Sequence, residues 1–254
     1  MFRTPVDRAL LCALAVASAV PASAWDPQTL GPRVERDVAQ ELACSPQAPL
    51  IKPSTTIIVA AGQERGKMQF AKGDTVIVNA GSGQGLSAGQ QYFVRRVVSD
   101  RFTEPFPGYR PISVHTAGWV RIVDVQADAA SATVTHACDG VMEGDYLDTF
   151  EMPVAPATTR SGEPDFGTPG HIILADERRQ MAGPGGLMVL DRGSDHGLQA
   201  GQELTIFRHG TRVADPVLRI GSGTAVIIRP QSAVIRIDRA KDAVYVGDLV
   251  AVHR

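Results

Sequence analysis

The sequence predicts a mainly β protein, with two tandem and related barrel-like or sandwich-like modules that follow a short N-terminal helix. The first observation is an internal repeat: the Gly-rich segment 81–90 returns at 193–202 with seven of its ten residues unchanged. The second is that each copy lies between two apolar runs of strand-like composition. The third is that 25 Gly and 17 Pro residues punctuate short apolar runs along the 254-residue chain, which favours many short strands.

We call segments 81–90 and 193–202 the turn signatures, because their glycines predict a sharp change of chain direction. Glycine adopts positive φ at little steric cost, so each signature can turn tightly and lead into a neighbouring strand. The one large apolar residue of each signature is expected to close a barrel end. The turn glycines and leucines are Gly81, Gly85, Leu86, Gly89, Gly193, Gly197, Leu198 and Gly201. The alternative, a Gly-rich anion cradle, lacks the spacing of a dinucleotide fingerprint, and no helical pattern follows it.

A second repeated feature is a Gly-Asp pair before the last strand of each module, Gly144-Asp145 and Gly247-Asp248. Glycine allows the bend, and Asp can accept a hydrogen bond from a nearby backbone N–H where the strand begins. The turn signatures are 112 residues apart and the Gly-Asp pairs 103. Most of the difference falls in the Pro- and aromatic-rich loop 101–111, and loops tolerate changes of length.

Residue composition predicts six strands in each module. The strands of the first module are expected at 55–60, 74–79, 91–98, 118–126, 131–136 and 144–147, and those of the second at 171–175, 187–190, 202–208, 224–229, 233–237 and 246–251. Polar loops are expected at 62–73 and 176–186. The N-terminal segment 25–50 is the helical candidate, because Val34, Val38 and Leu42 recur near a period of four.

Residues 1–24 are typical of a secretory signal peptide that is cleaved after Ala24. Arg3 and Arg8 precede an apolar run, and a small-residue Ala-Ser-Ala site ends it. The mature chain is then periplasmic or secreted and has no transmembrane span; an uncleaved membrane anchor is the alternative. We expect an N-terminal helical segment at 25–50, the first β module at 51–152, a Pro-rich linker at 153–169 and the second β module at 170–254.

Two cysteines remain after removal of the leader, Cys44 and Cys138. An even pair in an exported chain predicts a disulfide. Closing so long a loop could stabilise the chain by up to about 4–5 kcal/mol in the chain-entropy model. Two free thiols are the alternative. A metal site is not expected, because two distant cysteines without matched histidine spacing are not a zinc pattern.

No residue pattern predicts catalysis, a cofactor or a metal. The segment 62–68 has one residue too few for a phosphate loop, and Met68 stands where that loop needs Ser or Thr. The six histidines are dispersed, and the adjacent Asp195 and His196 are expected to be polar residues at a turn tip. A formal net charge of −2 gives no general attraction to nucleic acid.

The Pro- and aromatic-rich loop is the best candidate for ligand contact. Aromatic rings beside Arg could stack on sugars or meet a protein partner; alternatively, the rings cover a barrel end. The candidate contact residues are Arg101, Phe102, Phe106, Tyr109 and Arg110.

The order of a β run, the pattern Gly-Ser-x-x-Gly-Leu-x-Ala-Gly-Gln, a strand and a closing Gly-Asp strand resembles small β modules of bacterial envelope proteins. The resemblance, strongest over 76–95 and 189–208, is to the C-terminal module of the flagellar ring assembly protein FlgT and to modules beside LysM segments. It implies a non-catalytic role in binding an envelope protein or cell-wall glycan such as peptidoglycan. The alternatives are a structural adaptor of a flagellar or secretion ring, which would form oligomers, and an enzyme acting on envelope polymers, which would need two acidic residues in a cleft.

Overall fold

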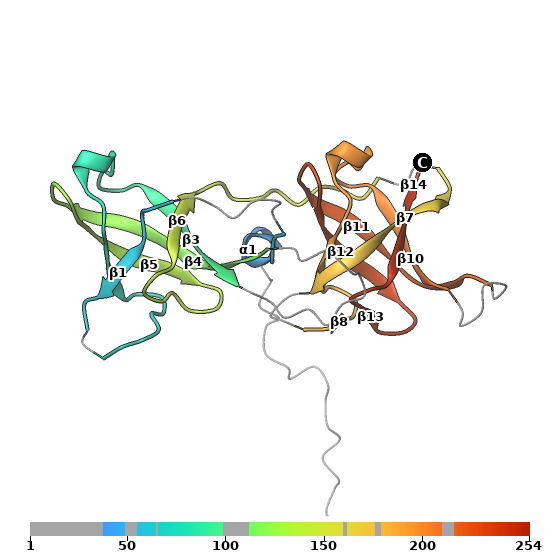
Figure 1. Cartoon of the computed structure of the whole chain (residues 1–254), viewed down its shortest axis with the longest axis horizontal. Coiled ribbons are helices and arrows are strands. Elements are labelled where there is room, and N and C mark those ends of the chain that lie inside the picture. The colour runs from blue at the N-terminus through green and yellow to red at the C-terminus, as the bar shows by residue number, and fades with distance from the viewer. Residues whose placement is uncertain are drawn as a thin grey trace, which may run out of the picture. The chain divides into compact units, whose positions relative to one another are not determined.

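The computed structural model describes residues 38–48, 55–64, 66–98, 112–159, 162–175, 179–209 and 216–254. In these residues the protein is mainly β, with one α-helix, α1 (Val38–Cys44), before the first strand (Figure 1). Contacts group Arg36–Arg254 into one compact unit. The prediction of a mainly β fold after a short N-terminal helix is therefore confirmed.

The first module is a six-stranded antiparallel sheet that curls on itself. Its strands are β1 (Val59–Gly62), β2 (Thr75–Val78), β3 (Gln91–Val98), β4 (Ser113–Val125), β5 (Ala130–Ala137) and β6 (Tyr146–Thr149). They lie in the order β1-β2-β5-β4-β3-β6. Among the described residues, the two edges meet through a bridge between Ile58 and Tyr146 and through hydrogen bonds beside it, such as Val59 N to Asp145 O at 2.8 Å.

The second module is a closed barrel with the same strand order. Its strands are β7 (Pro164–Ala175), β9 (Leu187–Leu190), β10 (Glu203–Arg208), β11 (Leu218–Ile228), β12 (Ala233–Ala240) and β14 (Leu249–His253). Around the barrel they follow β7-β9-β12-β11-β10-β14, which matches β1-β2-β5-β4-β3-β6 strand for strand. The shared order confirms two tandem, related modules.

Two minor strands lie beside the second barrel. They are β8 (Met181–Ala182) and β13 (Val244–Tyr245), which pair with each other. The segment 176–186, expected to be a polar loop, therefore contains a short strand. Two residues of alternating sequence carry too little pattern to reveal it.

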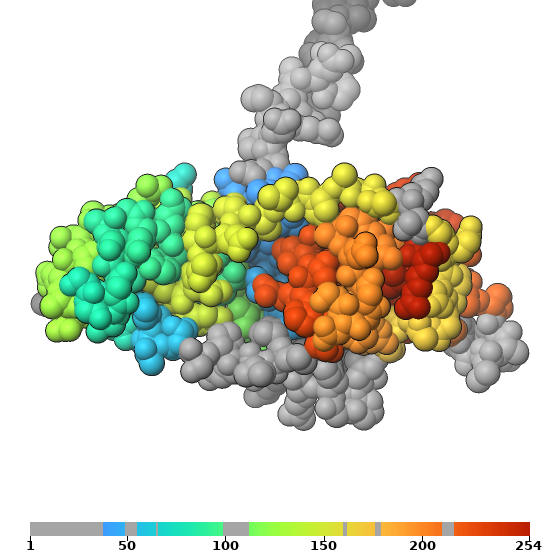
Figure 2. Space-filling view, turned by 90° about the horizontal axis from the view of Figure 1, so that it is seen from above, coloured from blue at the N-terminus to red at the C-terminus, as the bar shows by residue number. Residues whose placement is uncertain are grey.

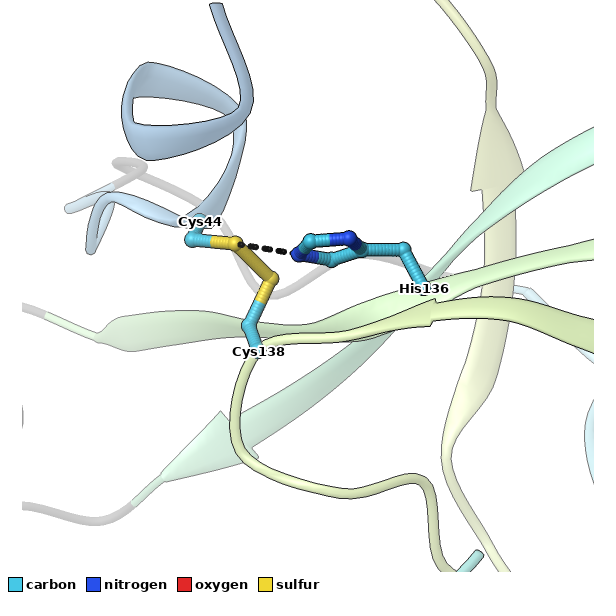
Figure 3. Close-up of side chains that lie close together, drawn as sticks. All are labelled: Cys44, His136 and Cys138. Carbon is cyan, nitrogen blue, oxygen red and sulfur yellow. Dashed lines mark hydrogen bonds between the residues drawn. A yellow bond between two sulfur atoms is a disulfide. The ribbon is translucent and has the colours of Figure 1, made fainter. Parts of the chain in front are cut away.

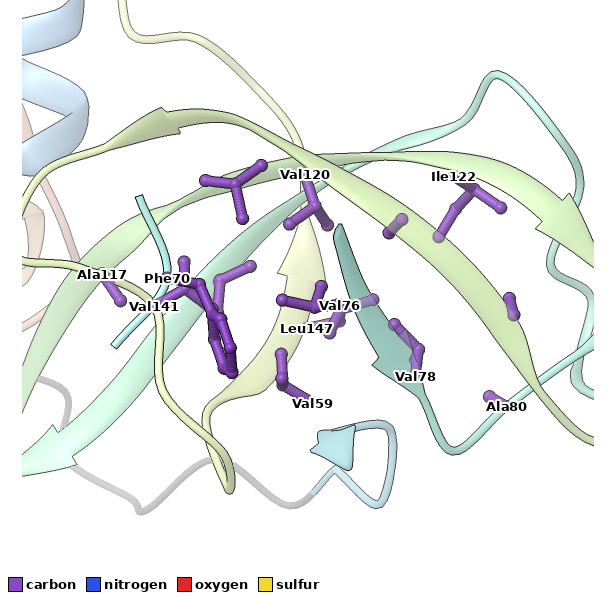
Figure 4. Packing of buried hydrophobic residues seen from close by; sticks show 14 of the residues in the cluster. Val59, Phe70, Val76, Val78, Ala80, Ala117, Val120, Ile122, Val141 and Leu147 are labelled. Atoms are coloured by element: carbon purple, nitrogen blue, oxygen red, sulfur yellow. The ribbon is translucent and has the colours of Figure 1, made fainter. Parts of the chain in front are cut away.

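Each module has its own apolar core. In β2, Val76 and Val78 are buried and alternate with half-buried neighbours, as a strand with one face on the core requires. The core of the first module gathers side chains from all its strands around Phe70 (Figure 4). Leu86 and Leu198, the large apolar residues of the turn signatures, are 3% and 2% exposed and belong to the two cores. Burial of one such side chain contributes about 1.5–3 kcal/mol.

Several strands are longer than their composition predicted. Strand β7 begins at Pro164, inside the range 153–169 expected to be a linker, and Pro164 pairs with His253. Proline is acceptable there because the first residue of a strand need not donate to the ladder. Strand β4 begins at Ser113 and continues through Gly118, where the register shifts. A bulge of this kind interrupts alternation without ending the strand.

Helix α1 covers only part of the segment 25–50 that periodicity favoured; residues 25–37 and 49–50 lie outside the described residues. Leu42 and Ala43 are buried. Ser45 Oγ donates a hydrogen bond of 2.7 Å to the carbonyl of Leu42, and the helix ends before Pro46. Within the described residues, no helix has the length and apolar character needed to cross a bilayer.

Candidate functional site

Each turn signature forms one turn of 3₁₀ helix, Ser82–Gln84 in the first module and Ser194–His196 in the second. The glycine after each turn is left-handed, with φ of 86° at Gly85 and 78° at Gly197. The chain then folds back, and Leu86 N donates to Gly81 O at 3.1 Å. The signatures are thus tight turns with the same geometry in both modules.

The first glycine of each signature lies against the hairpin that joins two later strands. A Cβ atom at Gly81 would be 2.1 Å from Gln126 O, and one at Gly193 would be 2.0 Å from Arg229 O. The next residue of each signature donates its N–H to the same carbonyl, at 2.9 Å in both modules. Glycine is required because any side chain would displace a backbone carbonyl.

The Asp195 and His196 pair closes the second turn. Gly193 N donates to His196 Nδ1 at 3.2 Å, the role that Gln84 Oε1 has for Gly81 N in the first module. Asp195 Oδ2 accepts a hydrogen bond from Gln231 Nε2. Both side chains therefore serve the local turn.

The Asp of each Gly-Asp pair is held by an arginine that the sequence analysis did not single out. Asp145 and Asp248 are 2% and 5% exposed. Arg96 Nε and Nη2 donate to the two carboxylate oxygens of Asp145 at 2.7 and 2.8 Å. Arg208 does the same to Asp248 at 2.5 and 2.8 Å. We call these two bidentate pairs the Arg–Asp clamps.

Each clamp also orders the turn that precedes it. Met142 N donates to Asp145 Oδ2 at 2.8 Å, and Tyr245 N donates to Asp248 Oδ2 at 2.7 Å. The hydrogen bonds to the carboxylate raise the pKa of Arg96 above its ordinary value, so the Arg96 guanidinium stays protonated. The clamps are best explained as structural supports, because both carboxylate oxygens are already occupied.

A sequence signal for the clamps exists. Arg96 and Arg208 each lie fifteen residues after the first glycine of their turn signature. A comparison of the two copies beyond the glycines would have found them.

Cys44 and Cys138 lie at disulfide distance, as their pairing in the sequence predicted. Their Sγ atoms are 2.00 Å apart and their Cα atoms 5.6 Å. The bond joins the end of α1 to the residue after β5. It thereby fixes the segment 38–48 to the first module.

Beside this segment lies a cavity of about 510 Å³, which we call the α1 cavity. Its walls come from the segment 38–48, which we call the α1 segment, from β3, from β6 and the chain that follows it, and from the end of β11. The apolar lining residues are Leu42, Ala43, Phe93, Met152, Pro153, Val154, Ile227 and Ile228. Figure 2 shows the blue α1 segment beside the yellow residues that follow β6. A cavity of this size and composition is within the usual range for small ligands or a few residues of peptide.

The α1 segment reaches residues of both modules. Gln47 N donates to Val114 O at 2.9 Å, and Val114 N returns a hydrogen bond of 2.8 Å to Gln47 O. The side-chain oxygen of Gln47 accepts from Arg229 Nη2. Leu42 packs with a cluster from β9, β11 and β12. The cavity wall is thus held by packing and by hydrogen bonds in addition to the disulfide.

Two arginines and two acidic residues, Asp148 and Glu151, line the α1 cavity. Arg95, only 6% exposed, donates to Asp148 Oδ2 at 2.7 Å and to Thr116 Oγ1 at 2.8 Å. Arg229 has Gln47 as its side-chain partner, its Nε is buried without a hydrogen bond, and among the described residues no ion pair is found for it. Burial and, secondly, the charge of Arg95 lower the pKa of Arg229. A partly buried cation of this kind favours a bound anion.

The five loop residues expected to contact a ligand lie outside the described residues: Arg101, Phe102, Phe106, Tyr109 and Arg110. The structure therefore does not bring them to the α1 cavity or remove them from it. Sequence reasoning missed the cavity itself, because Gln47 and Arg229 are 182 residues apart.

Comparison with known proteins adds no family. No protein-family model matches the chain, and no curated protein matches it.

Proposed function

We propose that this chain is an exported, non-catalytic protein of the bacterial cell envelope that binds a segment of another envelope protein in the α1 cavity. The signal-like leader and the resemblance to envelope modules support the compartment. The turn signatures and the Arg–Asp clamps are accounted for as supports of the fold, whereas the α1 cavity offers a partner apolar side chains and the partly buried Arg229.

The observation that carries the proposal is Arg229. Its guanidinium lines a cavity with both apolar and polar walls and, among the described residues, has one side-chain hydrogen-bond partner, the amide oxygen of Gln47. The charge of Asp148 acts on Arg229, but the pair forms no hydrogen bond among the described residues. A carboxylate of a partner would supply that bond, and a bond between guanidinium and carboxylate is worth roughly twice a neutral hydrogen bond. The partner segment therefore combines apolar side chains with at least one carboxylate.

A protein segment fits this cavity better than a glycan. Sugars are recognised on open aromatic faces, whereas Phe93 is 2% exposed and Trp119, packed beside it, is 7% exposed. The remaining lining combines aliphatic side chains with polar and charged ones, which are Gln47, Arg95, Asp148, Thr149, Glu151 and Arg229. Apolar side chains beside an arginine that has no ion pair among the described residues suit a peptide that carries an acidic residue.

Site-specific photocrosslinking tests the proposal. A photoreactive residue at Val154, which lines the cavity and is 85% exposed, should crosslink one envelope protein in cells. The same residue at Val123, exposed on β4 and absent from the cavity lining, is the matched control. Arg229→Glu should abolish the Val154 crosslink, whereas Arg239→Glu, the same charge change at a residue outside the cavity, should leave it.

Two outcomes would contradict the proposal. One is a Val154 crosslink that survives Arg229→Glu. The other is retention of the mature protein by purified peptidoglycan with no protein crosslink, which would identify the cell-wall glycan as the ligand.

A further inference from the structure

We propose that Cys44, His136 and Cys138 form a binding site for a thiophilic metal cation, such as Zn²⁺, when a dithiol reductant opens the disulfide. The three side chains offer two thiolates and one imidazole, a donor set found in zinc proteins. Their ligand atoms all lie within 4.8 Å of one another.

The distances suit a tetrahedral cation. Cys44 Sγ lies 3.8 Å from His136 Nε2. Zinc bonds of about 2.3 Å to sulfur and about 2.0–2.1 Å to nitrogen, at a tetrahedral angle, place these two atoms about 3.6 Å apart. Figure 3 shows the imidazole edge facing the two sulfur atoms. The two sulfurs, 2.00 Å apart in the disulfide, have to separate for a cation to enter.

The histidine is already oriented. Its ring is stacked on Trp119, with ring centroids 4.1 Å apart and an angle of 7° between the planes. His136 belongs to β5, and Cys138 follows the end of that strand. Cys138 N donates to Ala117 O at 2.9 Å, so the backbone of this second ligand is held beside the strand. A site with fixed ligands loses little entropy when a metal binds.

The third ligand stays nearby after the disulfide opens. Leu42 is 1% exposed and packs in a cluster with Leu187, Val226 and Val234. The paired backbone hydrogen bonds between Gln47 and Val114 hold the chain three residues beyond Cys44. Reduction therefore frees the sulfurs without releasing the segment that carries Cys44.

The chemistry balances in two steps. A dithiol gives two electrons and two protons to the disulfide, so Cys44 and Cys138 become thiols and the reductant becomes a disulfide. The cation then replaces one proton on each thiol, both protons pass to solvent, and neutral His136 donates its Nε2 lone pair. A solvent water completes the tetrahedron, because all three side chains are partly exposed.

Metal titration of the mature protein tests the site. Protein reduced under nitrogen should bind one Zn²⁺ per chain in competition with a chromophoric chelator, and Co²⁺ should give a thiolate-to-cobalt charge-transfer band. The oxidised protein should give neither signal. His136→Ala and Cys138→Ser should each weaken binding at least tenfold, whereas His209→Ala, at an exposed histidine of the second module, should leave it unchanged.

His136→Gln provides a milder variant if His136→Ala does not fold, which circular dichroism would reveal. The proposal is overturned if reduced wild-type protein binds no more zinc than oxidised protein. It is also overturned if the cobalt band persists in Cys138→Ser or if His136→Ala and His136→Gln bind as the wild type does. The result is independent of the α1 cavity, since no partner protein is needed.

Discussion

The two modules share strand order, turn signatures and Arg–Asp clamps, but they close their sheets differently. In the second module, β7 pairs with β14 at four residues of each strand, from Leu249 with His171 to His253 with Pro164. In the first module, β1 has four residues, and its edge meets β6 through a bridge at Ile58 and Tyr146. The length of the closing strand therefore varies between copies, whereas the clamp and the turn do not. We infer that the clamp and the turn define the fold.

The largest predicted effect is the loss of a clamp. Asp145→Ala and Asp248→Ala each leave an arginine without its buried carboxylate, and breaking a buried pair costs about 3–5 kcal/mol. Urea unfolding should show a similar decrease in the free energy of unfolding for both variants. A loss in one module only would mean that the clamps differ in energy despite their shared geometry. Arg236→Ala, which removes a half-exposed ion pair with Asp238, is the control and should cost under about 1 kcal/mol.

The disulfide distinguishes the modules most directly, because it belongs to the first. Cys44→Ser or Cys138→Ser should lower the free energy of unfolding by about 2–5 kcal/mol. Fluorescence of Trp119, which packs beside this bond, should report the change. Reduction of the wild type with a chelator present should match the variants. If the reduced protein is as stable as the oxidised one, the bond is not a stabilising feature.

Alanine substitutions of the signature glycines should lower stability most where the added Cβ would meet a neighbouring atom. Gly81→Ala and Gly193→Ala drive a Cβ into a carbonyl oxygen and should cost about 1–3 kcal/mol. In Gly85→Ala and Gly197→Ala the added Cβ meets no atom within 4 Å. Alanine would nevertheless have to adopt a positive φ, which should cost about 1–2 kcal/mol of stability. Thermal unfolding of the four variants would test this ranking. Unequal effects at Gly81 and Gly193 would show that the two turns are not equivalent.

The smallest effect concerns an ion pair that only the first copy has. Lys67 Nζ donates to Asp74 Oδ1 at 2.7 Å, and this bond is the main cause that lowers the pKa of Asp74. The second copy has Gly186 at the position of Asp74.

Because the pKa of Asp74 is lower in the folded state than in the unfolded state, its contribution to stability is present above the unfolded value. That contribution is lost as the pH falls through the folded value. NMR titration should place the pKa of Asp74 below its ordinary value. Lys67→Gln should raise the pKa of Asp74. If the substitution leaves this pKa unchanged, the Lys67–Asp74 ion pair does not form in solution.

Much of the fold could be predicted because the repeated glycines encode backbone geometry locally. The positive φ of Gly85 and Gly197 and the strands on either side of each signature depend on neighbours in sequence. The bounds of β4 and β7 could not be predicted in the same way. A bulge and a strand-initial proline are accepted only because a partner strand is present.

The candidate site could not be predicted because it is assembled from distant segments. Arg229 follows β11 at the hairpin against which Gly193 packs, and Gln126 takes the corresponding place in the first module. The arginine therefore occurs in one module only, and a search for residues repeated in both modules does not find it. Gln47, its partner, lies in a segment that the repeat does not include.

The Cys44–Cys138 bond also constrains the order of events as the chain is made. The two residues are 94 positions apart, so Cys44 emerges from the ribosome long before its partner and must wait as a thiol until β5 exists. The sequence holds one other cysteine, Cys12, inside the predicted leader. Removal of the leader before oxidation would leave Cys138 as the sole intramolecular choice, and timely cleavage would thus guard against a wrong crosslink.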